Sequence, residues 1–173
     1  MSERHWTPIA ACRVAAQWLA PNAGCRVLDV GSGVGKLCLV GSLTTEATFV
    51  GVEQRPHLVQ IARDLASELG AETATFLCDD AFTIDWREFT SLYFFNPFAE
   101  AIFPEAVQID STVECTEQGY DLVLERLARK LADLQRGTRV VVYHSVGCPM
   151  PEGFRCLDRQ LSGHSSLELW VRE

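Results

Sequence analysis

Short apolar runs alternate with amphipathic segments along most of the chain. An apolar run of four to eight residues between turn-forming or polar residues is typical of a buried strand. Five such runs are present: Arg26 to Val30, Thr48 to Glu53, Ala74 to Cys78, Leu92 to Phe95 and Thr138 to Ser145. We therefore expect five strands, each separated from the next by enough chain for a helix or a long loop.

The segments around these runs show the three- and four-residue spacing of helices with one buried face. The expected helices start at Thr7-Pro8 and stop before Pro21, and run over Lys36 to Leu43, Pro56 to Leu69, and about Gln118 to Gln135. Thr7 is expected as N-cap, because threonine before proline suits a helix start. In the third helix we expect a core-facing stripe, made of Leu58, Ile61, Ala62, Leu65 and Leu69.

The end of the chain has a different pattern. Phe154 to Leu161 and Ser166 to Arg172 are strand-like, and only a short polar turn separates them, which predicts an antiparallel hairpin. Strands that alternate with helices predict a parallel sheet covered on both faces. We therefore expect one α/β domain over residues 1–173. It would be a three-layer αβα sandwich whose seven-stranded sheet is mostly parallel.

Composition narrows the classes of protein. The chain has 173 residues, of which 47% are hydrophobic and 22% charged, so it has enough apolar material for a core. No apolar run approaches the roughly 20 residues that span a bilayer, and no apolar leader is evident, so we expect a cytoplasmic protein without a membrane partner. The net charge of −8 argues weakly against nucleic acid as a partner.

The pattern of the seven cysteines indicates neither a disulfide framework nor a metal site. Their number is odd, no two have the Cys-x-x-Cys spacing, and the four histidines are scattered. We therefore expect free thiols, no disulfide and no metal site.

A glycine cluster follows the first predicted strand directly. The segment Asp29-Val-Gly31-Ser32-Gly33-Val-Gly35 lies between a strand and a helix. Glycine lacks a Cβ and accepts positive φ, so such a turn can bend sharply and bring bare backbone close to a ligand. The spacing differs from the dinucleotide pattern GxGxxG, because the third glycine comes one position early. Leu37 after Lys36 also departs from the phosphate-loop pattern GK[ST].

The spacing DxGxGxG resembles motif I of class I S-adenosylmethionine-dependent methyltransferases, which have a Rossmann-like fold. The resemblance continues at Glu53, which ends the second strand, and at Asp80-Ala81 after the third. It implies that Glu53 accepts hydrogen bonds from both hydroxyls of the cofactor ribose, with Gln54 beside it. It also implies that Asp80, favoured over Asp79 by its position before Ala81, accepts one from the adenine amino group.

The same resemblance places the methionine part of the cofactor against the loop. Gly31, Ser32, Gly33 and Gly35 would approach it, and Asp29 would orient the loop or bind the amino group through water. Thr7 precedes a helix that lies across the cofactor mouth in related enzymes. It is expected mainly as a helix cap, with contact to the cofactor carboxylate as the alternative.

The segment Asn96-Pro97-Phe98 follows the fourth strand and resembles, in part, the [DNS]PP[YFW] motif IV of amino-group methyltransferases. Methyl transfer is an in-line displacement, so positioning of the nucleophile dominates. The resemblance implies that Asn96 orients an amine, that the Pro97 carbonyl assists, and that Phe98 forms a wall. A simple turn with Phe98 in the core is the alternative. His144 and Glu100 are weaker candidates for acceptor contacts.

We therefore expect an enzyme that moves a methyl group from S-adenosylmethionine to an amine of a protein side chain or small molecule, leaving S-adenosylhomocysteine. Two alternatives remain open at this point. One is a non-catalytic S-adenosylmethionine-binding partner subunit, and the other is a NAD(P)-dependent oxidoreductase. The acceptor and the oligomeric state do not follow from the residues.

Overall fold

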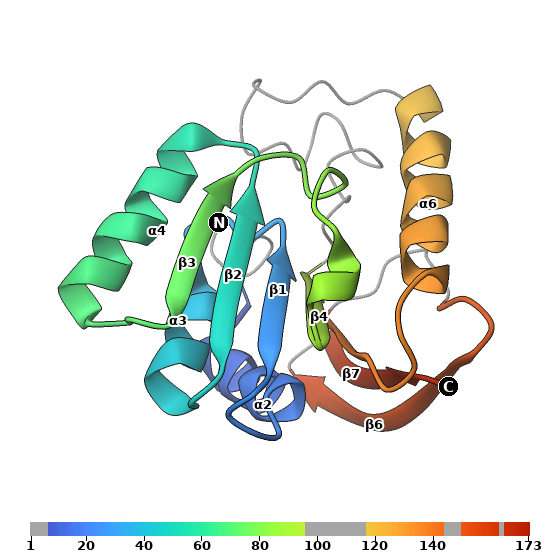
Figure 1. The fold of residues 1–173 in the computed structure, drawn as a ribbon, viewed down its shortest axis with the longest axis horizontal. Coiled ribbons are helices and arrows are strands. Elements are labelled where there is room, and N and C mark those ends of the chain that lie inside the picture. Colours follow the sequence, from blue (N-terminus) through green and yellow to red (C-terminus); the bar gives the residue numbers. More distant parts are fainter. Residues whose placement is uncertain (1–6, 96–116, 144–149, 163–164) are drawn as a thin grey trace.

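Seven strands form one mixed sheet with helices on both faces (Figure 1). This computed structural model describes residues 7–95, 117–143, 150–162 and 165–173, with only the backbone described for 117–121 and 162. The strands are β1 (Arg26–Val30), β2 (Thr48–Glu53), β3 (Ala74–Cys78), β4 (Ser91–Phe95), β5 (Arg139–Tyr143), β6 (Phe154–Ser162) and β7 (Ser165–Arg172). The helices are α2 (Ile9–Leu19), α3 (Lys36–Thr44), α4 (Pro56–Leu69), the short 3-10 helix η1 (Trp86–Glu88) and α6 (Glu117–Ala132).

The strand order is β3-β2-β1-β4-β5-β7-β6. Strands β1 to β5 pair in parallel, whereas β7 runs antiparallel to both β5 and β6. The predicted parallel sheet with a C-terminal hairpin is thus confirmed. The order reverses between β1 and β4, and open sheets of this type bind ligands beyond the carboxyl ends of the strands at such a point.

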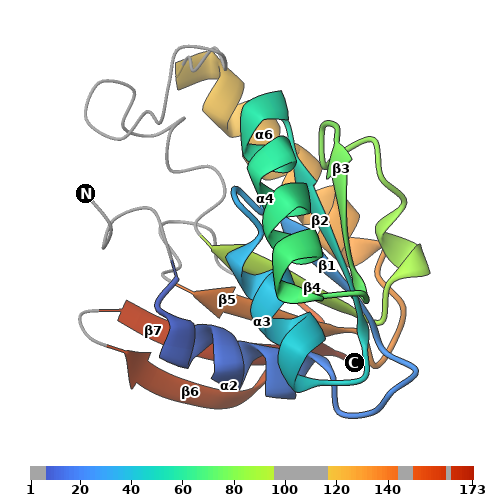
Figure 2. The same cartoon turned by 90° about the vertical axis from the view of Figure 1, so that its left-hand side faces the viewer.

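Two apolar cores lie on opposite faces of the sheet. Helices α2, α3 and α4 lie on one face of the sheet and α6 lies on the other (Figure 2). Side chains of α2, α3 and α4 form one core with β1, β2 and β4, while α6 and Trp86 belong to the other. Successive strand residues serve different faces, so Val27 joins the first core and Leu28 the second. Both residues are fully buried, which explains why the strands read as continuous apolar runs rather than as alternating ones.

The apolar stripe expected on α4 is only partly correct. Leu58 and Ala62 are buried, but Ile61 and Leu69 are 43% and 50% exposed. Helix α4 packs on β3, which is the edge strand of the sheet, and on β2, so part of its apolar surface stays uncovered. The sequence also did not predict η1, and α6 ends at Ala132 rather than near Gln135.

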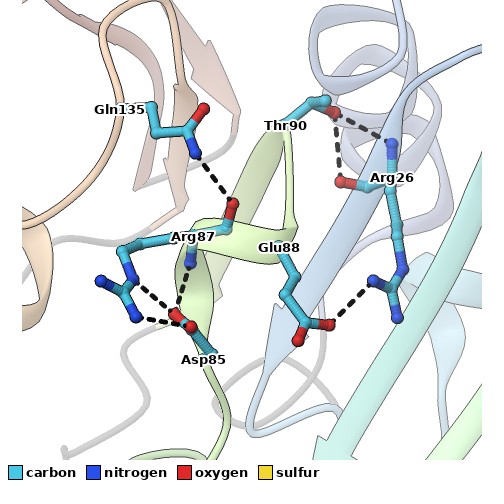
Figure 3. A network of polar contacts seen from close by, with 6 residues as sticks. All are labelled: Arg26, Asp85, Arg87, Glu88, Thr90 and Gln135. Atoms are coloured by element: carbon cyan, nitrogen blue, oxygen red, sulfur yellow. Dashed lines mark hydrogen bonds and ion pairs between the residues drawn. The ribbon is translucent and has the colours of Figure 1, made fainter.

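A polar network lies where β1 and β4 begin, at the end of the sheet away from the glycine loop (Figure 3). It consists of Arg26, Asp85, Arg87, Glu88, Thr90 and Gln135. Arg26 N donates to Thr90 Oγ1 at 2.9 Å, and that hydroxyl donates back to the Arg26 carbonyl at 3.1 Å. Hydrogen bonds from Arg87 lower the pKa of Asp85 to about 2. These contacts fix the start of two neighbouring strands.

The outermost strand, β6, is solvent-exposed along residues 155–161. Its register against β7 shifts between Cys156 and Asp158. Among the described residues, no helix is both long enough and apolar enough to cross a membrane.

Candidate functional site

The glycine loop leaves β1 at the carboxyl edge of the sheet and leads into α3. Gly31, Gly33 and Gly35 have φ values of 74°, 55° and 77°, in the left-handed region that favours glycine. The N–H groups of Gly31 and Ser32 both donate to the Val52 carbonyl at 3.0 Å. The loop is therefore anchored to β2, while Gly35 occupies the N-cap position of α3.

One aromatic ring explains why two of the nearby positions lack a side chain. A Cβ at Gly35 would lie 2.4 Å from Phe76 Cε1, and a Cβ at Gly51 would lie 2.7 Å from Phe76 Cδ1. The Gly51 position is also closed by Ser32, whose Oγ would be 2.7 Å away. The β3 ring thus packs against both the loop and β2, and bare backbone is required at residues 35 and 51.

Glu53 joins the loop to the end of β2. Its Oε2 accepts a hydrogen bond from Gly33 N at 3.1 Å, and its Oε1 accepts one from Arg55 N at 3.0 Å. The Arg55 guanidinium lies 3.4 Å from the same Oε1. The carboxylate is 6% exposed and is held in one orientation by donors on both oxygens. The next residue, Gln54, is exposed.

The two acids after β3 lie beside this group. Asp79 N donates to the Glu53 carbonyl at 3.1 Å, which extends the strand pairing by one residue. Asp80 Oδ1 accepts from Phe82 N at 2.9 Å, and its Oδ2 lies 3.5 Å from Arg126 Nη2. The structure therefore brings Gly33, Glu53 and the Asp79-Asp80 pair to neighbouring strand ends, as the sequence predicted.

Helix α6 holds the loop that carries Asp80. The Arg126 guanidinium lies 4.2 Å from the centre of the Phe82 ring, and Phe82 in turn stacks on Trp86 at 6.0 Å. One turn further along α6, Lys130 donates to the Ile84 carbonyl at 2.6 Å. Trp86 is buried, and its indole N–H donates at 2.8 Å to the carbonyl of the predicted site residue Ala81.

Asp29 is buried below the loop rather than exposed at its mouth. It is 4% exposed, and Cys38 Sγ donates to its Oδ2 at 3.5 Å. Burial raises the pKa of the Asp29 carboxyl to about 7, and the charge of Glu53 adds to this rise, while the Cys38 bond opposes it. Asp29 is still within β1, where it is paired with Gly51 of β2 and Tyr93 of β4, so it precedes the loop rather than forming part of it.

The expectation that Thr7 caps the first helix is wrong. Pro8 holds the N-cap position of α2, and its carbonyl accepts from Cys12 N at 2.9 Å. The Thr7 hydroxyl instead forms a buried hydrogen bond of 2.7 Å with the Tyr93 hydroxyl on β4. The Thr7 side-chain oxygen, which the local sequence predicted as a helix cap, is thus engaged in a contact with a distant strand.

The residues proposed for chemistry on the acceptor lie outside the described part of the chain. These are Asn96, Pro97, Phe98, Glu100 and His144. The strands that lead to them are described, and their last residues, Phe95 and Tyr143, face each other in register. Their rings stack with centres 5.5 Å apart, so β4 and β5 end side by side.

Three side chains that contact the predicted acidic site residues were not found from the sequence. Arg55 contacts Glu53, Arg126 contacts Asp80, and Cys38 contacts Asp29. Only Arg55 had a possible signal, since it follows the acid by two positions. Within the described ranges, no group of three or more His, Cys, Asp or Glu side chains could hold a metal ion.

Comparison with known proteins identifies relatives of this arrangement. The family described as "Methyltransferase domain" matches residues 21–108, which include the loop, Glu53 and Asp80. The O-methyltransferase rstn1 of Aspergillus nomiae is 27% identical over 141 residues, which are 81% of this chain and 56% of that protein. The chain thus spans little more than half the length of this curated relative.

Solved structures of low identity share the fold. An RNA methyltransferase from Salinibacter ruber, in complex with S-adenosylhomocysteine, is 21% identical with a TM-score of 0.67 over 96% of this chain and 93% of that one. The magnesium protoporphyrin IX methyltransferase from Synechocystis, with bound S-adenosylmethionine, is 16% identical with a TM-score of 0.69 over 95% and 79% of the two chains.

Proposed function

The chain belongs to the methyltransferase domain family, and we propose that it uses S-adenosylmethionine to methylate an amine nitrogen on a protein side chain or a small molecule. The observation that carries the cofactor part of this proposal is the 3.1 Å hydrogen bond between Gly33 N and Glu53 Oε2. It joins a bare-backbone turn and a carboxylate at the ends of two adjacent parallel strands, where this class of sheet binds nucleosides.

The side chains present at this edge fit such a cofactor. Ser32 Oγ, within the described part of the chain a buried oxygen without a hydrogen-bond partner, lies against Gly51 and the Phe76 ring, so it packs below the loop rather than facing a ligand. Glu53 can accept a ribose hydroxyl on Oε2. Asp80 is 37% exposed, so its carboxylate can also accept the adenine amino group while it keeps its bond from Phe82 N.

Bound S-adenosylmethionine would supply an electrophilic methyl group on its sulfonium. The protein then has to hold the acceptor in line with that methyl and remove a competing water shell. We assign orientation of the acceptor amine to the Asn96 side-chain oxygen and the Pro97 carbonyl. Phe98 would shield the site and stabilise positive charge that develops on the nitrogen.

An oxygen acceptor is the second candidate, and a specific observation favours it. The curated relative that covers most of this chain is named an O-methyltransferase. The partial motif at Asn96-Pro97-Phe98 favours nitrogen instead, because its carbonyl oxygens accept the protons of an amine. An RNA substrate is named for one fold neighbour, so the net charge of −8 does not exclude a nucleic acid acceptor.

Ligand binding tests the cofactor. Calorimetry with S-adenosylmethionine, S-adenosylhomocysteine and NAD should show saturable binding of the first two and none of NAD. Binding of NAD and of neither other ligand would overturn the proposal in favour of an oxidoreductase. The relatives named above give no support to that alternative.

Transfer of labelled methyl tests the enzyme and its acceptor. The labelled cofactor is incubated with separate protein, RNA and small-molecule fractions, and the modified atom is identified by mass spectrometry. Asn96→Ala should lose transfer and keep S-adenosylhomocysteine binding, whereas Asn22→Ala, in a turn before β1, should keep both. Label on oxygen would refute the amine assignment, and binding without transfer to any fraction would favour a non-catalytic subunit.

A further inference from the structure

Arg126 of α6 lies beside the carboxylate of Asp80 and is held there by charge and by stacking. Its Nη2 is 3.5 Å from Asp80 Oδ2, and its guanidinium lies 4.2 Å from the centre of the Phe82 ring. Among the residues that the structure describes, the Arg126 side chain donates no hydrogen bond. A guanidinium carries its N–H donors in a planar fork, so Arg126 has donors to offer a ligand.

Asp80 presents an acceptor next to these donors. Its Oδ1 accepts from Phe82 N at 2.9 Å, whereas its Oδ2 accepts no hydrogen bond within the described ranges. The side chains of Arg126 and Asp80 are 51% and 37% exposed, so both can be reached by a ligand. A donor and an acceptor thus lie side by side at the position where the adenine is expected.

The edge of adenine that carries the amino group has the complementary pattern. The amino group donates, and it is flanked by two acceptors, N1 and N7. The amino nitrogen and N1 are attached to the same carbon, whereas N7 lies one bond further away. The amino group and N7 therefore form the wider pair, which suits the 3.5 Å between Asp80 Oδ2 and Arg126 Nη2 better than the narrow pair does.

The two side chains together also distinguish adenine from other purines. An arginine by itself favours guanine, because it can donate to both O6 and N7. With Asp80 beside Arg126, a carbonyl at C6 would place an acceptor against a carboxylate. Guanine and hypoxanthine are therefore disfavoured, and the amino group of adenine is accepted.

We infer that Arg126 is a specificity-determining residue for the cofactor, which donates a hydrogen bond to adenine N7 while Asp80 Oδ2 accepts one from the amino group. This inference rests on the proposed function, because it assumes that the site binds an adenosyl cofactor. It goes further by assigning a ligand contact to α6, a helix that carries none of the motifs on which the resemblance depends.

The test compares ligands that differ by one atom of the base. S-Adenosylhomocysteine and its 7-deaza and 1-deaza forms, in which C–H replaces N7 or N1, are titrated by calorimetry into wild type, Arg126→Met and Arg129→Met. Arg129 is the matched control, because it lies on the same helix and pairs with Glu125 rather than with a site residue. Urea titration checks folding, and Arg126→Ala replaces Arg126→Met if the latter loses its cooperative transition.

In wild type, the 7-deaza form should bind about fivefold more weakly than S-adenosylhomocysteine, since one solvent-accessible hydrogen bond is worth about that much. In Arg126→Met this penalty should fall below about twofold. The penalty for the 1-deaza form should be the same in both proteins, because Arg126 does not contact N1. Arg129→Met should keep all the wild-type ratios.

Two kinds of result would overturn the inference in distinguishable ways. If Arg126→Met weakens all three ligands equally and keeps the 7-deaza penalty, or if wild type shows no such penalty, Arg126 does not contact N7 and the proposed function stands. Loss of the 1-deaza penalty in place of the 7-deaza penalty has the same meaning. If wild type binds none of the three ligands, the proposed function itself fails, and the inference fails with it.

Discussion

Replacement of Gly35 by alanine tests the packing below the loop. Gly35 has φ +77°, and a Cβ there would meet Phe76 Cε1 at 2.4 Å and Cζ at 2.5 Å. Gly70 provides the matched control, because its φ of +67° is similar but a Cβ there would have no neighbour within 4 Å. The two alanine variants therefore share the backbone strain and differ in the steric clash.

The expected difference follows from these two contributions. A left-handed alanine costs about 1 kcal/mol at either site. The clash adds about 1–3 kcal/mol at residue 35, typical of overpacking. The Phe76 ring cannot simply move, since the residue is buried with only 5% of its surface exposed. Gly35→Ala should thus lower the free energy of unfolding by about 2–4 kcal/mol, and Gly70→Ala by about 1 kcal/mol.

The free energy of unfolding is measured by urea titration with circular dichroism for both alanine variants, for Phe76→Leu, and for the two double variants that combine Phe76→Leu with each alanine substitution. Leucine removes the outer ring atoms, so Phe76→Leu/Gly35→Ala should be less destabilised than the sum of its single variants by at least about 1 kcal/mol. Phe76→Leu/Gly70→Ala should be additive. If Gly35→Ala costs no more than Gly70→Ala, or if the first pair is also additive, the steric account of the loop is wrong.

Three further predictions concern buried acids, the Thr7 contact and the adenine end. Burial raises the pKa of Asp29 from 3.8 to about 7, so between these pH values the folded protein keeps a proton that the unfolded chain has lost. The free energy of unfolding should therefore fall by about 4 kcal/mol as the pH rises from about 4 to 7, and this group should cause no further fall above that range. Asp29→Asn should remove that fall, and urea titrations showing the same slope in both proteins would contradict it. Tyr93→Phe and Thr7→Val each remove one side of a buried 2.7 Å hydrogen bond and should cost about 1–2 kcal/mol, while the double variant should cost less than their sum in the same assay; strict additivity would argue against the bond. Asp80→Ala should weaken S-adenosylhomocysteine binding about tenfold by calorimetry and Asp79→Ala less than about threefold, and the reverse order would assign adenine recognition to Asp79.

The features that follow from local sequence were predictable. Apolar runs predicted the strands, and parallel strands bring their carboxyl ends to one edge of a sheet. The sequence alone therefore predicts that the glycine loop, Glu53 and Asp80 lie near one another, and the hydrogen bond between Gly33 and Glu53 agrees with that prediction. Gly70 also ends α4 in the left-handed conformation, as a C-cap glycine should.

Contacts between distant parts of the chain were not predictable in this way. Thr7 and Tyr93 are 86 positions apart, and nothing near Thr7 indicates that a tyrosine hydroxyl will take its oxygen. The cation of α6 that contacts Asp80 carries no local signal either. Such pairings depend on how the elements pack, and the packing also decided which residues of the α4 stripe stay exposed.

Strand β6 has a consequence for how the molecule meets other chains. An exposed outer strand is ordinarily a template for strand addition, which leads to aggregation or unwanted pairing. Here the change of register after Cys156 breaks the regular spacing of free backbone groups. Arg155 and Arg159 also carry charges that are engaged with Glu173 and Glu168, and an incoming chain would have to strip them of water. These two features make the addition of another strand to this side of the sheet less favourable.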